Sequence, residues 1–440
     1  MNRRYFLMST AAVTTASRAN PQRLPSDTVR VACVGFNGRG RAHIQGYLKT
    51  PNTEIAALCD VDEAVLERGL KTVEAAGRKR PAAFTDLRKL LEDKSIDAIS
   101  IATPNHQHTL QTIWGCQAGK DVYVEKPCSY NIFESRQIVA AARKYNRIVM
   151  HGTGASASLH EARQAMADGA IGEVYMARGL CFKWRDTIGR TREEPVPPGV
   201  HYDLWLGPAD KRPFTRNRFH YNFHWFWDYG NGDFGNQGSH QMHAARWALG
   251  VKYPTKVSAA GGHFIFDDDQ ETPNTLVVTL EYNHEGRKKM LIFEVRHWIT
   301  NTEGEMAGKS DEMAGPAAGA PQTVGNLFYG SKGYLVMRGG FRTFLGKEQA
   351  PGPASKQAER SSPFANFVAV VRSRKREDLK AEIEEGAISM VSLHLGNIAY
   401  RLGRTLHFDP ESMRCIGDDE ANAMFTRKQY RPPFVIPKLV

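Results

Sequence analysis

Short apolar segments alternate with helical segments over residues 28–150. Near-continuous apolar strands that are separated by helices pack into a parallel sheet with helices on both faces. We therefore predict an α/β fold that begins with a doubly wound parallel sheet. Its expected strands are residues 29–35, 54–60, 97–103, 121–126 and 147–153, and its expected helices are residues 39–49, 63–77, 85–93, 108–119 and 134–146.

The first strand runs into a glycine-rich turn, GFNGRG, at residues 35–40. A dinucleotide fingerprint has glycine at the first, third and sixth positions of such a turn, and here Asn37 holds the third. Asn adopts positive φ more readily than most residues, so a tight turn that brings backbone N–H groups to a pyrophosphate stays feasible. The pattern predicts a Rossmann domain whose cofactor contacts include Gly35, Asn37, Gly38, Arg39 and Gly40.

Asp60 ends the second strand, 20 residues after Gly40. A carboxylate at this place binds the adenosine ribose hydroxyls and repels a 2′-phosphate, which favours NAD over NADP. Arg39 in the glycine-rich turn leaves NADP as the alternative cofactor. A turn that binds no nucleotide is the remaining interpretation.

Two further strands of the predicted sheet end in polar residues, in ATPNHQH (102–108) and VEKP (124–127). Ligands of such sheets bind outside the carboxyl ends of the strands. A lysine beside a carboxylate in a partly desolvated cleft can hold a substrate hydroxyl and help to move its proton, while Pro127 fixes the turn and allows a cis peptide bond. A purely structural Lys–Glu pair is the alternative. The candidate cofactor contacts here are Thr103, Pro104, Asn105, His108, Glu125 and Lys126.

The motifs VGFNGRG, CDVD, IATPNHQH and VYVEKP occur in this order. Together they resemble the glucose-fructose oxidoreductase, inositol dehydrogenase and rhizopine-catabolism (Gfo/Idh/MocA) family, over nearly the whole chain after residue 27. The resemblance implies that Lys126 contacts both the nicotinamide ribose and the substrate, and that Glu125 and Pro127 shape the turn. It also implies a homodimer or homotetramer that assembles through the second domain.

From His151 onward the expected strands have hairpin connections or long excursions between them rather than alternating helices. This pattern predicts an α+β domain with a mostly antiparallel, open sheet and helices on one face. The predicted organisation is a signal segment at 1–27, an NAD(P)-binding Rossmann domain at 28–150, and a substrate-binding and oligomerisation domain at 151–440. The expected strands of the second domain are residues 174–182, 255–266, 275–282, 288–298 and 333–340.

Aromatic, amide and imidazole side chains are densest in residues 218–250. Aromatic planes and directional hydrogen-bond partners suit a sugar. The family resemblance places a glycine cluster here, matched by residues 230–232, and aligns Gly238 and His240 with the family pattern. His240 is thus the candidate general acid–base.

The same stretch departs from the family pattern because Asn236 and His243 stand where Asp is usual. Asn236 can orient a hydroxyl but cannot carry a proton, and nearby Asp233 is the candidate substitute. His240 and His243 lie three residues apart, but no third ligand is spaced to complete a zinc set, so we predict no metal site.

These residues predict an enzyme that transfers a hydride between NAD(P) and a hydroxyl carbon of a sugar, polyol or sugar derivative. One alternative is an NAD-dependent glycosidase, in which transient oxidation acidifies a neighbouring C–H bond, a glycosidic bond is eliminated and the hydride returns, with no net redox change. A second alternative is a non-catalytic sugar- or nucleotide-binding protein, for which Asn236 is the main argument.

The N-terminus places Arg3 and Arg4 before Phe6 and Leu7 and a short run of small residues. This pattern resembles a twin-arginine signal and predicts export to the periplasm; an ordinary basic tail would leave the protein in the cytoplasm. No other stretch is long and apolar enough to span a bilayer.

The formal net charge is +11 at pH 7. A basic protein attracts anionic ligands, nucleic acid or anionic polymers, although solubility alone also explains such a charge. The largest basic run, at residues 372–380, is interrupted by acids and has no nucleic-acid motif beside it, so we predict no nucleic-acid partner. The six cysteines are widely scattered, and we expect them to be buried fillers rather than disulfides or metal ligands.

Overall fold

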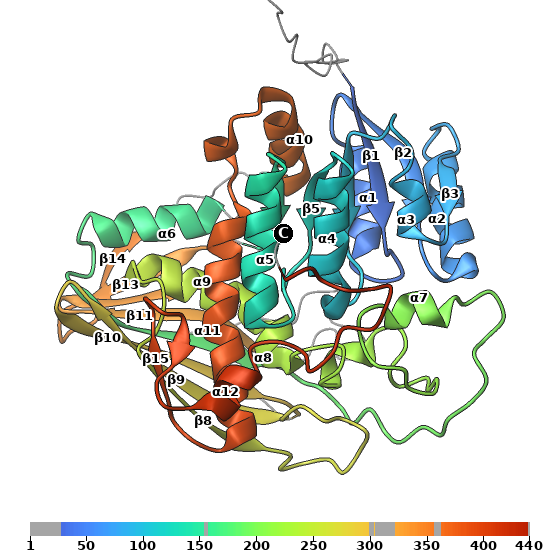
Figure 1. The fold of residues 1–440 in the computed structure, drawn as a ribbon. Helices are drawn as coiled ribbons and strands as arrows, with labels where there is room; N and C mark the ends of the chain where they lie inside the picture. The colour runs from blue at the N-terminus through green and yellow to red at the C-terminus, as the bar shows by residue number, and fades with distance from the viewer. Residues whose placement is uncertain (1–27, 154–156, 299–302, 304–321, 356–361, 439–440) are drawn as a thin grey trace, which may run out of the picture.

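The structure, a computed structural model, describes residues 28–153, 157–298, 303, 322–355 and 362–438. It contains two sheets, one at the start of the chain and one built from its later part, with helices packed between them (Figure 1). The signal segment predicted at residues 1–27 lies outside the described residues.

The first sheet has six strands, and every neighbouring pair in it is parallel. Its order, β3-β2-β1-β4-β5-β6, is that of a dinucleotide-binding Rossmann sheet, with the order reversing between β1 and β4. The doubly wound prediction is therefore confirmed, and the short β3 is an addition to it. The strands are β1 (Val29–Val34), β2 (Thr53–Cys59), β3 (Ala82–Phe84), β4 (Ala98–Ile101), β5 (Asp121–Val124) and β6 (Val149–His151).

Two helices of this part begin at a residue whose side chain caps the helix N-terminus. Asp62 caps α2, because its Oδ1 accepts hydrogen bonds from the backbone N–H groups of Ala64 and Val65 at 2.9 and 3.2 Å. Asn131 caps α5 by accepting from the Glu134 N–H at 2.8 Å. The helices are α1 (Gly40–Leu48), α2 (Glu63–Ala75), α3 (Leu87–Leu90), the 3₁₀ turn η1 (Asn105–Gln107), α4 (His108–Gln117) and α5 (Ile132–Lys144).

The second sheet has ten strands in the order β14-β13-β12-β11-β7-β10-β9-β8-β15-β16. Its neighbours pair antiparallel except β7 and β10, which are parallel. The mostly antiparallel prediction is therefore confirmed. The strands are β7 (Val174–Phe182), β8 (Lys256–Gly262), β9 (Thr275–His284), β10 (Arg287–Arg296), β11 (Thr323–Gly330), β12 (Gly333–Met337), β13 (Phe341–Leu345), β14 (Ala350–Ala354), β15 (Leu406–Asp409) and β16 (Arg414–Cys415).

Helices cover one face of the second sheet (Figure 1). The long helix α11 packs against α5 of the first part and against α9 and β8 of the second. It is apolar and buried along most of its length, as expected for a helix enclosed on all sides. The helices of this part are α6 (Ala157–Ala167), α7 (Tyr202–Leu206), η2 (Asn222–Trp225), α8 (Gly232–Asn236), α9 (Gly238–Leu249), α10 (Pro363–Ser373), η4 (Arg376–Asp378), α11 (Ile383–Leu402) and α12 (Asp419–Ala423).

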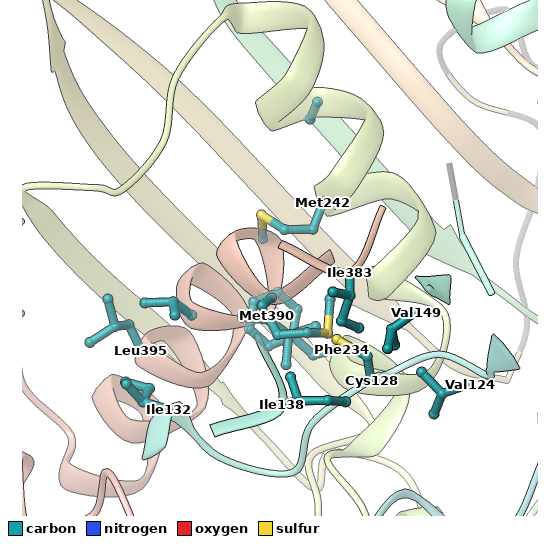
Figure 2. Close-up of a cluster of buried hydrophobic side chains, with 14 of the residues drawn as sticks. Val124, Cys128, Ile132, Ile138, Val149, Phe234, Met242, Ile383, Met390 and Leu395 are labelled. Carbon is teal, nitrogen blue, oxygen red and sulfur yellow. The ribbon is translucent and has the colours of Figure 1, made fainter. Parts of the chain in front are cut away.

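One hydrophobic cluster joins the two parts. Figure 2 shows Val124 and Val149 of the first sheet in the same cluster as Phe234, Met242 and Met390 of the second part. Because a close-packed core resists deformation, this cluster fixes the position of each sheet's strand ends relative to the other.

Helix α10 crosses back to the first part of the chain. It packs against α1 and β1, and its Phe364 ring lies 5.1 Å from the His43 ring and 4.9 Å from the Tyr47 ring, centroid to centroid. Gly46 on α1 is needed for this contact, because a Cβ there would lie 2.1 Å from the Phe364 ring. A segment more than two hundred residues away therefore helps to cover the first sheet.

All six cysteines are buried and unpaired, as the sequence predicted. Within the described part of the chain, no helix combines the length and the hydropathy that a membrane crossing requires.

Candidate active site

A cavity of about 950 Å³ lies outside the carboxyl ends of β1, β2, β4 and β5. Its opposite wall comes from the segment after β7, from residues 220–224 and from residues 236–240. Both parts of the protein therefore contribute to one cavity at the place where Rossmann sheets bind their ligands.

The turn after β1 has the geometry of a phosphate-binding turn. Gly35 has a φ of +73°, and a Cβ on it would lie 2.7 Å from the Thr103 side chain. A Cβ on Gly40, the first residue of α1, would lie 2.0 Å from the Gly35 carbonyl oxygen, whereas Gly38 faces open space. Open space beside the N-terminus of a helix leaves room for a pyrophosphate, so this turn fits a dinucleotide.

Asn37 lines the cavity but does not adopt positive φ, contrary to the possibility raised from the sequence. The left-handed residue of the turn is Gly35, which reverses the chain before Asn37 is reached. The Asn37 side chain instead accepts a hydrogen bond from Arg68 Nη2 at 3.2 Å.

Asp60 lines the same cavity and is 6% exposed. Its Oδ2 accepts from the Phe36 N–H at 2.9 Å and its Oδ1 from the Asp62 N–H at 3.1 Å. Burial raises the pKa of Asp60 to about 6, which leaves the carboxylate charged at neutral pH. His220 approaches from the second part, with Nε2 2.9 Å from Asp62 Oδ2, and closes this end of the cavity.

Arg39 donates from Nε to Glu125 Oε1 at 2.8 Å, and His43 Nε2 lies 3.1 Å from the same oxygen. Burial acts to raise the pKa of Glu125, but the hydrogen bond with His43 and the charge of Arg39 outweigh burial and hold the pKa well below its usual range. The ion pair directs Arg39 toward the end of β5 and not toward Asp60, which weakens the argument that Arg39 accommodates a 2′-phosphate.

The end of β4 is tied to the turn after β5. His108 is buried, and its Nδ1 and Nε2 lie 2.7 Å from the carbonyl oxygens of Pro127 and Thr103. Thr103, Pro104 and Asn105 line the cavity, and the buried Asn105 Nδ2 has no hydrogen-bond partner among the described residues. An orphaned donor in this wall is suited to a bound nucleotide.

Lys126 connects the two parts. Its peptide bond to Pro127 is cis, and its Nζ donates to the Asn236 carbonyl oxygen at 2.7 Å and to Asn236 Oδ1 at 2.9 Å. Burial lowers the pKa of Lys126 to about 8, and the charge of Lys183 adds to this lowering against the opposing effect of Glu125. Lys126 is therefore close to the protonation equilibrium that proton transfer near neutral pH requires.

His240 also lines the cavity, and its Nδ1 lies 2.8 Å from Thr153 Oγ1, which leaves Nε2 for a substrate. Burial, together with the charge of Lys126, lowers the pKa of His240 to about 3. The ring is therefore neutral at physiological pH. The structure places Lys126, at the end of β5, and Asn236 and His240, on the opposite wall, in the lining of one cavity.

Asp233 has a different environment from the one a substitute acid–base needs. Its carboxylate is fully buried and accepts from Arg185 Nε at 2.8 Å and Nη2 at 3.2 Å, and His297 Nε2 lies 3.0 Å away. Burial favours a raised pKa, but the charge of Arg185 and the His297 hydrogen bond hold the pKa of Asp233 well below its usual range. Asp233 is absent from the described lining of the cavity, so the geometry favours holding Arg185 over moving a proton.

His243 faces away from the cavity, with Nδ1 3.1 Å from Ser389 Oγ on α11. Although His243 lies three residues from His240 in the sequence, the two side chains do not line the same site. Among the residues that the structure describes, no group of three His, Cys, Asp or Glu side chains is placed to hold a metal ion.

Sequence reasoning missed several residues of the second wall. The sequence contained a signal for Lys183 and Arg185, because these charged residues follow β7 just as Glu125 and Lys126 follow β5. His224 was within the aromatic stretch noted above but was not singled out. The missed lining residues are Lys183, Arg185, His220, His224 and Gln237.

The comparisons with known proteins agree with this geometry. A model of the oxidoreductase family's NAD-binding Rossmann fold matches residues 29–153, and a model of the same family's C-terminal alpha/beta domain matches residues 158–276 and 348–436. The fold and the cavity thus define an NAD-binding oxidoreductase. The two models together match well over half of the residues, and the chain belongs to the Gfo/Idh/MocA family.

Named relatives match a smaller part of the chain than the two family models do. A glycosyl hydrolase family 109 protein from Shewanella pealeana is 33% identical over 128 residues, which is 28% of each chain. One from Saccharopolyspora erythraea is 30% identical over 159 residues, 35% of each chain. The alignments therefore span about a third or less of these relatives.

Solved structures share the whole fold at low identity. The aldose-aldose oxidoreductase from Caulobacter crescentus, complexed with glycerol, has a TM-score of 0.62 at 18% identity and covers 87% of this chain and 100% of its own. The WlbA dehydrogenase from Bordetella pertussis, in complex with NADH and UDP-GlcNAcA, has a TM-score of 0.60 at 20% identity, covering 87% and 99%.

Proposed function

We propose that the protein is an NAD-dependent oxidoreductase that transfers a hydride between the cofactor and a hydroxyl carbon of a sugar, a polyol or a sugar derivative. The observation that carries the proposal is that Lys126, at the end of β5, and His240, on the opposite wall, line the same cavity. Bound NAD supplies the hydride acceptor at its nicotinamide.

Lys126 is the proposed proton acceptor. Its lowered pKa of about 8 makes the neutral amine accessible near physiological pH, so the amine can take the proton of a substrate hydroxyl as the C–H bond breaks. Glu125 and Asn236 hold the lysine from opposite sides, Glu125 through the backbone N–H at 3.1 Å and Asn236 through Nζ. The amine is thereby presented in one orientation.

His240 is proposed to orient that hydroxyl. With a pKa of about 3 the ring stays neutral, so it acts through a hydrogen bond and does not store the proton. Since Lys126 and His240 line the same cavity, we expect both to act on one hydroxyl. Asn236 accepts two hydrogen bonds from the lysine amine, through its carbonyl oxygen and Oδ1.

The test is a turnover screen with the full-length protein purified so that its NAD stays bound. Sugars, polyols and aryl glycosides are supplied, and NADH absorbance and aglycone release are both recorded. Net NADH formation with a sugar or polyol is the expected result. A broad panel that gives neither signal would reject the enzyme and favour a binding protein.

A second candidate function is glycoside cleavage without net redox change. The similarity to glycosyl hydrolase family 109 proteins favours it, although it covers only 28% of the chain. Lys126 and His240 would have the same tasks in both reactions. Release of aglycone without accumulation of NADH in the same screen separates this function from the first.

We further propose a homodimer or homotetramer. The face of the second sheet away from the helices carries an exposed apolar side chain, Val277 of β9, which is 42% exposed and alternates with the buried Leu276 and Val278. Light scattering after gel filtration measures the mass, and a monomer at micromolar concentration would contradict the assembly.

The export proposal rests on Arg3 and Arg4. A route that moves folded protein suits an enzyme that carries its NAD with it. Replacing both arginines by lysine is expected to leave the protein in the cytoplasm, and mass spectrometry of the native N-terminus reports whether the segment is removed.

A further inference from the structure

The substrate end of the cavity is strongly positive. Lys126, Lys183 and Arg185 line it together with aromatic, amide and imidazole side chains. The acidic residues in the described lining, Asp60, Asp86 and Glu125, all come from the first part of the chain. The wall contributed by residues 183–322 therefore carries cations and no carboxylate.

Two of the cations that line the cavity are already balanced. Arg185 is paired with Asp233, whose carboxylate lies behind it and outside the cavity lining. Arg39 is paired with Glu125. These pairs hold the two guanidinium groups in place and contribute little net charge.

Lys183 has no such partner. It follows directly on β7, and its Nζ donates to the uncharged Gln237 Oε1 at 2.5 Å. Among the described residues no carboxylate lies within ion-pair distance of it. A lysine in a cavity wall beside a second lysine is unfavourable without an anion, so the protein maintains a charge that a ligand can neutralise.

His224 supplies an independent sign of a ligand. It is 2% exposed and lines the cavity. Its Nδ1 lies 2.6 Å from the Tyr221 carbonyl oxygen and must donate to it, so Nε2 is left as an acceptor. That buried Nε2 has no hydrogen-bond partner among the described residues, which a hydroxyl of a bound molecule would provide.

We propose that the substrate is a sugar acid, a uronic or aldonic acid, whose carboxylate binds Lys183 and the Nη1 side of Arg185 while a hydroxyl donates to His224 Nε2. This inference rests on the proposed function and names its substrate class. A carboxylate matches the charge count better than a phosphate. When Lys126 is deprotonated as the proposed base, Lys183 is the one lysine left charged without a partner, whereas a phosphate ester brings close to two negative charges.

The experiment compares matched pairs: glucose with glucuronate, galactose with galacturonate, and glucose 6-phosphate as the other anion. The NAD-loaded, full-length protein is used for kcat/KM and, in parallel, for calorimetric binding. We expect a preference of about 10- to 100-fold for the uronate over its neutral parent, the size of a charge-assisted hydrogen bond.

Four variants locate the effect. Lys183→Gln is expected to lower the uronate-to-neutral ratio by about 10-fold or more, and Lys183→Arg to preserve most of it. Lys211→Gln removes the same charge from an exposed position outside the cavity lining and should leave the ratio unchanged. His224→Phe is expected to raise the KM of the uronate more than it lowers kcat. Thermal unfolding confirms that each variant is folded.

The outcomes separate the two proposals. Turnover of neutral sugars with no uronate preference, or a Lys183→Gln variant that keeps the ratio, overturns the sugar-acid inference and leaves the oxidoreductase standing. Uronate binding that depends on Lys183 but is followed by no turnover supports the subsite and overturns the proposed function. A preference for glucose 6-phosphate over glucuronate overturns the assignment of a carboxylate.

Discussion

The two parts of the protein each bring one buried carboxylate, one arginine and one histidine to the surroundings of Lys126. Their distances nearly coincide: the arginine Nε lies 2.8 Å from the carboxylate in both, and the histidine Nε2 lies 3.1 Å away in one and 3.0 Å in the other. The Glu125 group consists of Arg39, His43 and Glu125, and the Asp233 group consists of Arg185, Asp233 and His297.

The two groups differ in what they expose. Glu125 itself lines the cavity, whereas Asp233 lies behind Arg185 and does not belong to the described lining. The Arg39 side chain is 45% exposed at the cofactor end, and the Arg185 side chain is 16% exposed at the substrate end. The Glu125 group therefore fixes the turn that faces the cofactor, while the Asp233 group positions a cation toward the substrate.

Lys126 lies between the groups, and its replacement tests whether they serve one reaction. Lys126→Met is expected to lower kcat by about 10³-fold, because it removes the proposed proton acceptor. Lys126→Arg keeps the charge but cannot release a proton near neutral pH, so it should be almost as impaired. Stopped-flow measurement of NADH formation gives kcat. Turnover by Lys126→Met within tenfold of the wild type would show that neither group acts through the lysine.

The pH dependence follows from the same residue. Burial lowers the pKa of Lys126 to about 8, and the proposed base is its deprotonated amine. The kcat/KM of substrate oxidation should rise about tenfold per pH unit below pH 8 and level off above it. The inflection should be missing in Lys126→Met, and an unchanged inflection there would assign it to another group.

His240→Ala is expected to lower kcat by about 10²-fold while NAD affinity changes little. Because Lys126 and His240 are proposed to act on the same hydroxyl, the double variant should be scarcely worse than the worse single variant. His243→Ala is the matched control, since its ring contacts Ser389 and not the cavity. Near-wild-type turnover in His240→Ala would make that histidine structural.

Glu125 and Lys126 could be placed at the cavity from the sequence, because the carboxyl ends of the parallel strands lie along one edge of the first sheet. Gly35, Asp60 and Lys126 each end or follow such a strand, so their meeting follows from the alternation of strands and helices. The same logic does not extend to the second wall. The contact from Lys126 to Asn236 spans 110 residues, and the contact from His220 to Asp62 spans 158.

The side chains of the second wall are brought together by contacts between residues far apart in the sequence, which local sequence patterns do not reveal. Asp233 looked like a free acid in sequence because its partner Arg185 lies 48 residues away and His297 lies 64 away. Strands β11, β13, β14, β15 and β16 were not predicted either. Of these, β14 lies at one edge of the sheet and reads APGPA, a sequence with low strand propensity.

Paired neutral substitutions compare the two groups directly. Glu125→Gln should weaken NAD binding about tenfold, because Arg39 then loses its anchor at the cofactor end. Asp233→Asn should leave NAD binding nearly intact and raise the substrate KM about tenfold through a displaced Arg185. Fluorescence titration of NAD and steady-state kinetics measure the two effects. If both variants weaken both ligands equally, the division of labour between the groups is wrong.

The smallest expected effect concerns the far cofactor end, where Asp60 holds two backbone N–H groups and is expected to accept from the adenosine ribose. Its charge repels a 2′-phosphate, so the wild type should bind NAD more tightly than NADP and Asp60→Ala should narrow the difference about tenfold. Burial raises the pKa of Asp60 to about 6, so the carboxylate is charged above that pH and neutral below it. The preference of the wild type should therefore change more steeply than that of Asp60→Ala as the pH falls below 6, because the 2′-phosphate takes up a proton near that pH in both proteins but Asp60 does so only in the wild type. A wild-type preference for NADP, or the same pH dependence of the cofactor preference in both proteins, would show that another group sets this preference.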